Sequence, residues 1–296
     1  MSLMATVDDY EDLPTLTNHL AEQLRLQRLA LILGAGISKP FGLPDWPGLL
    51  KKLYEAQGAS PPSSGEPTQQ AEDFRLKFFK NDYKGFVVAV RTALNKDVNV
   101  EFKKLRENLT LAAIGSLIMA SKRGSTAEVV TFNYDNLLEI YLAYHGFMAH
   151  SVTEEIHWKG DADVTIYHPH GFLPYGNASE PSLRLILDRN SYDEILGKDL
   201  PWRQLMLTLM RTHTCLFIGL SGNDPALTSL LTDVKKIHAI VGGTALFWGV
   251  CFTTDPDLKL RWESRKVFCK VLNMYDELPD ILFKICQTAA TINGVA

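Results

Sequence analysis

The sequence is poor in cysteine, and its few cysteines lie far apart. The 296 residues include four of them: Cys215, Cys251, Cys269 and Cys286. No two form a Cys-x-x-Cys pair, the spacing that zinc clips use, and single cysteines in apolar runs are typical of reduced, buried thiols. We therefore predict a protein that holds no metal.

The sequence also lacks a long apolar run and an excess of either charge. Its net charge is −4 and its pI is about 6.1, which gives no electrostatic reason to expect nucleic-acid binding. No apolar stretch approaches the length of a membrane span, and the first residues carry no basic-plus-apolar signal peptide. These absences predict a cytoplasmic protein without a membrane or nucleic-acid partner.

Strand-like segments are missing between Pro47 and Gly124, where the sequence is helical and contains one Pro/Gly/Ser-rich loop. One apolar strand, Leu29–Leu33, precedes this stretch. After it, short β-rich runs alternate with helical ones, and the expected strands are Glu128–Phe132, Val164–His168, Leu183–Leu187, Cys215–Leu220, Ala245–Phe252 and Lys266–Leu272. This alternation predicts an α/β fold with a Rossmann-like, doubly wound parallel sheet and no zinc ribbon. Residues 1–46 and 125–296 would form the core, and residues 47–124 an inserted helical module.

A glycine-rich turn follows the first strand. Gly34 and Gly36 allow the backbone to approach a diphosphate, and the N-terminus of the next helix would supply N–H donors. Lys39 stands where a dinucleotide-binding fingerprint has its third glycine, and no second strand ending in an acidic residue follows. These residues alone therefore fit a phosphate cradle or a simple strand-to-helix turn equally well.

Polar clusters follow three later strands. They are Asn133 and Asp135, then His168 and His170, then Gly219, Ser221, Gly222 and Asp224. The carboxyl ends of parallel strands lie at one edge of a sheet, which is where such folds bind ligands. Each cluster also has a purely structural explanation, since Asn and Asp cap helices and glycines make turns. A histidine at a strand end can act as a base near neutral pH, whereas two histidines without further ligands do not make a metal site.

The four clusters together resemble the sirtuin superfamily. The matching runs, in family order, are Gly34-Ala35-Gly36-Ile37-Ser38, Gly42-Leu43-Pro44-Asp45-Trp46, Thr131-Phe132-Asn133-Tyr134-Asp135, His170-Gly171 and Gly219-Leu220-Ser221. The resemblance implies a NAD-binding fold, with NAD+ as the substrate. It extends over most of the chain.

The chain departs from deacylase sirtuins at several positions. It lacks their two Cys-x-x-Cys pairs, has Trp46-Pro47 where they have an aromatic residue and an arginine, and has Phe132 where they have glutamine. In these respects it is similar to a bacterial branch of anti-phage defence, whose members hydrolyse NAD+ to ADP-ribose and nicotinamide. That branch implies NAD+ hydrolysis, or cyclisation, with a possible homo-oligomer and a possible separate sensor or ATPase protein. A deacylase or ADP-ribosyltransferase, and a non-catalytic NAD or ADP-ribose sensor, are the alternatives.

The resemblance also implies roles for individual residues. His170 would be the general base, and Asn133 would hold the ribose or the attacking water. Asp135 would support this hydrogen-bond network, Asp45 would lie near the nicotinamide, and Asp224 would face the adenosine ribose. The implied NAD-contacting residues are Gly34, Ala35, Gly36, Ser38, Asp45, Trp46, Asn133, Asp135, His170, Gly219, Ser221 and Asp224.

Overall fold

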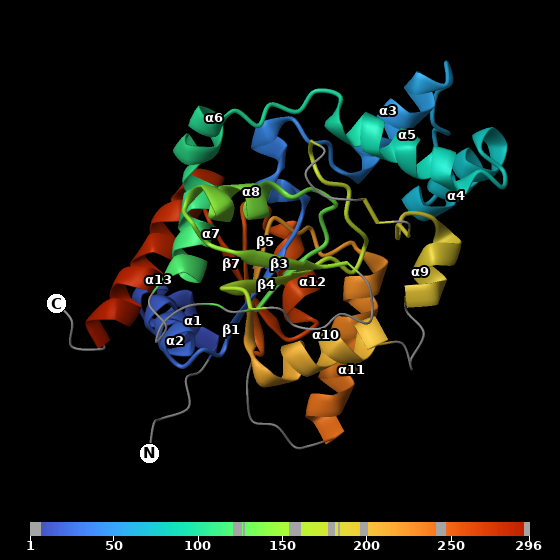
Figure 1. Ribbon diagram of the computed structural model, residues 1–296. Coiled ribbons are helices and arrows are strands. Elements are labelled where there is room, and N and C mark those ends of the chain that lie inside the picture. Colours follow the sequence, from blue (N-terminus) through green and yellow to red (C-terminus); the bar gives the residue numbers. More distant parts are fainter. Residues whose placement is uncertain are drawn as a thin grey trace.

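The computed structural model contains one seven-stranded parallel sheet between two layers of helices (Figure 1). It describes residues 7–120, 126, 128–153, 161–176, 181–182, 184–195, 201–240 and 247–292. The strand order is β3-β4-β2-β1-β5-β6-β7. The strands are β1 (Leu29–Leu33), β2 (Glu128–Thr131), β3 (Ala149–Val152), β4 (Val164–Tyr167), β5 (Thr214–Ile218), β6 (Gly249–Thr253) and β7 (Val267–Val271). The predicted α/β, doubly wound parallel fold is confirmed.

The central strand β1 shows why the sheet needs helices on both faces. All five of its residues are buried. Leu29, Leu31 and Leu33 contribute to one apolar core, whereas Ala30 and Ile32 contribute to the other. This follows from the two-residue period of a strand, which sends successive side chains to opposite faces.

Helices α2 (Leu13–Arg25), α7 (Leu109–Met119) and α13 (Leu278–Ile292) pack together on one face of the sheet. Helices α10 (Pro201–Thr212) and α11 (Pro225–Ile240) pack on the other face (Figure 1). The remaining helices of eight or fewer residues are α1 (Val7–Glu11), α6 (Phe102–Glu107), α8 (Leu137–Tyr144), α9 (Arg189–Ile195) and α12 (Asp257–Glu263). No helix in the described part of the chain is long and apolar enough to cross a membrane.

The stretch between β1 and β2 is helical in its described residues. It contains α3 (Trp46–Ala56), α4 (Pro67–Phe78), α5 (Tyr83–Asn95), α6 and α7. Helices α3, α4 and α5 pack on one another away from the sheet, whereas α7 packs against α13 beside it (Figure 1). The division into a core and a 47–124 module stays a prediction.

Two strand predictions differ from the structure. Residues 184–187 are not a strand; the N–H of Ile186 donates to the carbonyl of His170 and the N–H of Leu185 to the Tyr83 hydroxyl, so side-chain and loop partners replace a ladder. Residue 183, where this strand was expected to begin, lies outside the described residues. Strand β3 was not predicted, because the short, half-buried sequence Ala149–Val152 has little apolar signal.

Candidate functional site

A cavity of about 680 Å³ lies at the carboxyl edge of the sheet, where β1, β2, β4 and β5 end. The chain turns to opposite sides of the sheet after β1 and β5, so this edge is a topological switch point, the usual ligand site of such folds. Every residue predicted to contact NAD lines the cavity: Gly34, Ala35, Gly36, Ser38, Asp45, Trp46, Asn133, Asp135, His170, Gly219, Ser221 and Asp224. The structure therefore brings the four sequence clusters together.

The glycine-rich turn packs directly on the loop after β5. The N–H groups of Gly34 and Gly36 donate to the carbonyls of Ile218 and Gly219, each at 3.0 Å. A Cβ atom on Gly36 would lie 2.7 Å from the Gly219 Cα, so this approach requires glycine. The helix expected after the turn does not follow it directly. Two short 3₁₀ segments, η1 (Ala35–Ile37) and η2 (Lys39–Phe41), follow instead, because Pro40 and the left-handed Gly42 prevent a continuous helix.

Asp45 and Trp46 begin helix α3 at the rim of the cavity. The Asp45 carboxylate accepts the N–H of Gly48 at 3.1 Å, which caps the helix, and lies 2.8 Å from the Lys39 ammonium. The hydrogen bond from Lys39 lowers the pKa of Asp45, against the opposing effect of its partial burial. The Trp46 ring stacks on Tyr192 with centroids 5.4 Å apart, and its indole Nε1 is buried without a hydrogen-bond partner. A polar atom of this kind is available to a ligand.

Asn133 joins the loops after β1 and β2. Its side-chain amide nitrogen donates to the Gly34 carbonyl and to the Ser38 hydroxyl, both at 3.1 Å. The Ser38 hydroxyl in turn donates to Asp135 at 2.8 Å, and the second Asp135 oxygen accepts the N–H of Leu137. Burial raises the pKa of Asp135, although these two hydrogen bonds oppose the shift. The network leaves the amide oxygen as the polar atom of Asn133 for a ligand.

His170 is buried, yet its Nε2 atom makes no hydrogen bond. Burial lowers the pKa of His170, while the nearby Asp224 carboxylate and a hydrogen bond with the Phe132 backbone act in the opposite direction. Because Nε2 has no hydrogen-bond partner, the bond to the Phe132 carbonyl falls to Nδ1–H, which leaves a lone pair on Nε2. The neutral ring is therefore a proton acceptor on the cavity wall.

Gly171 allows His170 to take this position. Its φ is +101°, and a Cβ atom there would lie 2.5 Å from the carbonyl oxygen of Arg184. Only glycine tolerates both the left-handed backbone and the adjacent chain.

His168 lies two residues earlier but points elsewhere. Its ring is fully buried, with Nε2 2.7 Å from the Glu139 carboxylate and Nδ1 3.2 Å from the backbone oxygen of Asn133. It does not line the cavity. Both ring nitrogens have protein partners, so His168 supports the backbone of Asn133 instead of facing a ligand.

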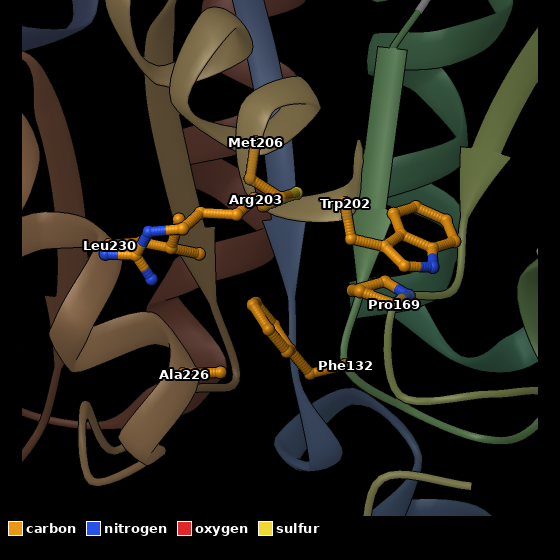
Figure 2. Close-up of a pocket in the computed structure, with 7 residues that line it drawn as sticks. All are labelled: Phe132, Pro169, Trp202, Arg203, Met206, Ala226 and Leu230. Carbon is orange, nitrogen blue, oxygen red and sulfur yellow. The ribbon is translucent and has the colours of Figure 1, made fainter. Parts of the chain in front are cut away.

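Phe132 forms a wall between the main cavity and a much smaller apolar pocket behind it. Figure 2 shows the seven residues around this pocket, which are Phe132, Pro169, Trp202, Arg203, Met206, Ala226 and Leu230. The Phe132 ring also meets the His170 ring edge to face at 4.8 Å. The apolar surroundings on this side are part of the burial that lowers the pKa of His170.

Sequence reasoning did not place three aromatic residues of the cavity in the site: Phe132, described above, Tyr134 and Tyr192. The Tyr192 hydroxyl donates to the Asp224 carboxylate at 2.7 Å, and the Tyr134 hydroxyl donates to the carbonyl of Ile186, also at 2.7 Å. Tyr134 stood between two predicted residues and could have been found from that spacing. Tyr192 comes from helix α9 and belongs to no motif. Its sequence carries no signal for the site.

No group of three or more His, Cys, Asp or Glu side chains that could hold a metal ion occurs among the residues the structure describes. The predicted absence of a metal remains a prediction.

The fold is that of an α/β protein with a ligand-sized cavity at the carboxyl edge of its parallel sheet. Residues 127–266 match the family model of the SIR2-like domain. This match covers slightly less than half of the chain and confirms the sirtuin-like resemblance.

Other comparisons are more distant. A comparison with curated proteins found no match. A structure described under the heading of the mechanism and regulation of Sir2 enzymes is 14% identical, with a TM-score of 0.47, and the alignment covers 94% of this chain and 98% of that one. A mutant Sir2 homologue in complex with ADP-ribose is 12% identical, with a TM-score of 0.48, and the alignment covers 93% and 98% of the two chains. At these scores neither structure carries an argument about fold or function.

Proposed function

We propose that this protein is a NAD+ glycohydrolase that cleaves the nicotinamide–ribose bond, giving nicotinamide and ADP-ribose or its cyclic form. The SIR2-like domain supports a NAD-dependent enzyme. The observation that carries the proposal is the pairing, in one cavity, of an unpartnered histidine base with the Asn133 network. A cavity of about 680 Å³ lies within the range of ligand pockets, about 300–1,000 Å³.

The chemistry needs few groups from the protein. Cleavage builds positive charge on the ribose, as in glycoside hydrolysis, and nicotinamide leaves as a neutral molecule. Water then adds to the ribose carbon and loses one proton. In our proposal Asn133 holds the water or a ribose hydroxyl through its amide oxygen, and the Nε2 atom of His170 takes the proton. The glycine turn would lie along the diphosphate, where Gly34 and Gly36 present backbone without side chains.

Trp46 supports the nicotinamide end of the cavity in this arrangement. Among the described residues, two buried side-chain nitrogens without a hydrogen-bond partner belong to residues that line the cavity. They are the indole Nε1 of Trp46 and the Nε2 of His170. Both lie on the side of the cavity that also contains Tyr192. A ligand with a polar group on an aromatic ring, such as nicotinamide, suits these donors and acceptors.

We propose, from the resemblance to anti-phage proteins, that the activity serves bacterial antiviral defence in the cytoplasm. A homo-oligomer and a separate sensor or ATPase protein would be its partners. Depletion of NAD+ would be the effect on the cell.

The test is to incubate the purified chain with NAD+ alone and with NAD+ plus an acetylated peptide, and to measure free nicotinamide. Release with NAD+ alone supports the hydrolase. Release that requires the peptide, with loss of its acetyl group, would instead show a deacylase. NAD+ binding without release under either condition, or with candidate partner proteins, would show a sensor.

A further inference from the structure

Asp224 lies next to His170, the proposed base. Its Oδ2 atom is 3.6 Å from the Nε2 atom of His170, and both side chains are largely buried. The distance is longer than a direct hydrogen bond but close enough for a strong charge interaction in a buried setting. Asp224 therefore places a carboxylate next to the atom of the base that accepts the proton.

The protein fixes that carboxylate in place from two sides. Its Oδ1 atom accepts the N–H of Leu227 at 2.8 Å in the first turn of helix α11, and its Oδ2 atom accepts the Tyr192 hydroxyl at 2.7 Å. Burial raises the pKa of Tyr192 well above its ordinary value, and the negative charge of Asp224 raises it further. The phenol therefore stays protonated and remains a donor. The Tyr192 ring also meets the His170 ring at 5.3 Å and stacks on Trp46.

We propose that Asp224 is a positioning residue for His170: it stabilises the imidazolium that forms when His170 accepts a proton, and Tyr192 holds it in the required place. This inference rests on the proposed function, since it assigns a partner to the base of that reaction. The proton passes from water or a ribose hydroxyl to Nε2, and the positive charge that the ring gains lies beside the Asp224 carboxylate, 3.6 Å away. No other reactant is needed.

The surroundings of His170 leave Asp224 as its charged partner. Phe132, following β2, contributes an apolar ring and a carbonyl, and Tyr192, from α9, contributes a neutral phenol. Among the described residues, three other carboxyl groups line the cavity: Asp135 bonds to Ser38, Asp45 pairs with Lys39, and Glu66 is exposed before helix α4. Asp224, at the start of α11, is the acidic group whose charge acts on His170.

The first experiment measures the pKa of His170 directly by NMR titration of histidine-labelled protein without substrate. The His170 signal is assigned with the His170→Gln variant. We expect a lower pKa in Asp224→Asn, because the charge is lost while asparagine still caps α11. The matched control is Asp82→Asn at the start of α5, where Asp82 accepts the N–H of Gly85 at 2.9 Å but lies outside the cavity lining. The Asp82→Asn variant should leave the pKa of His170 unchanged. An equal His170 pKa in wild type and Asp224→Asn would overturn the proposal.

The second experiment follows nicotinamide release against pH. In Asp224→Asn we expect kcat to fall about 10- to 100-fold, part of the range for general-base catalysis, with KM for NAD+ little changed. The acid limb of the profile should move to lower pH, since the base is then less readily protonated. A raised KM with unchanged kcat and acid limb would show that Asp224 only holds the substrate, which contradicts the proposal. Failure of the wild type to release nicotinamide would count against the proposed function alone, because the NMR titration still decides the role of Asp224.

Discussion

The Ser38 hydroxyl donates a 2.8 Å hydrogen bond to the Asp135 carboxyl group, although the two residues are 97 positions apart in the chain. The bond is buried and connects the loop after β1 to the loop after β2. Ser38 also accepts the Asn133 amide, so one hydroxyl fixes two of the predicted site residues.

Replacing Ser38 with alanine should therefore affect both stability and activity. Loss of a partner leaves a buried polar group unsatisfied, which costs about 1–3 kcal/mol in the free energy of unfolding. Urea denaturation and nicotinamide release measure the two effects. Ser116→Ala is the control, because Ser116 donates within its own helix to the carbonyl of Ala112 and lies outside the cavity. Equal stability and activity of the two variants would contradict a structural role for the network.

Gly171→Ala should displace His170. The substitution combines a left-handed backbone, which costs about 1–2 kcal/mol, with a clash against the Arg184 carbonyl. Gly146→Ala provides the comparison, because φ there is +76° but a Cβ atom meets nothing within 4 Å. We expect both variants to lose stability in thermal unfolding, and Gly171→Ala alone to lose activity as well. Full activity of Gly171→Ala would show that the clash does not move the base.

Arg75 and Asp188 connect helix α4 to the segment that leads into α9. Their side chains form a 2.6 Å ion pair and are 17% and 7% exposed. Removing one partner of a buried pair typically costs about 3–5 kcal/mol, so Arg75→Ala should strongly lower the free energy of unfolding. Lys51→Ala breaks an exposed pair with Glu55, 68% and 54% exposed, and should cost at most about 1 kcal/mol. Similar losses from the two substitutions, measured by denaturant unfolding, would be inconsistent with the buried pair.

The pH dependence should follow the lowered pKa of His170. A base must be deprotonated, so kcat/KM for NAD+ should persist below pH 6.5, the ordinary value for histidine. The free energy of unfolding also depends on the protonation of His170. The unfolded chain binds the proton more readily than the folded chain, so the contribution of His170 is present above pH 6.5 and is lost as the pH falls towards its folded pKa. A kcat/KM profile whose acid limb lies above pH 6.5 would contradict this.

The sequence predicted the parts of the site that are local. Strand β1 has the predicted bounds, Leu29–Leu33, since an apolar run before a glycine turn is a strong signal. Because parallel strands end at one edge of a sheet, the sequence alone predicted that the four polar clusters lie together. His168 and His170 could not be separated in this way, because a two-residue spacing predicts the same face, and the chain turns after Tyr167.

The remaining parts depend on contacts across the chain. Tyr192 reaches Asp224 from a helix outside every motif, 32 positions away. Residues 184–187 have an apolar, strand-like sequence, but their backbone groups bond to His170, Tyr83 and Ser191. Such partners are decided by tertiary packing, which local periodicity does not report.

The central claim is that His170 is the base, and one substitution tests it most directly. Nicotinamide release and NAD+ affinity are measured for wild type, His170→Ala and the exposed-site control His145→Ala. We predict that His170→Ala loses about 10²–10⁴-fold in rate and retains NAD+ binding, while His145→Ala matches wild type. Release of nicotinamide by His170→Ala at the wild-type rate would contradict the account.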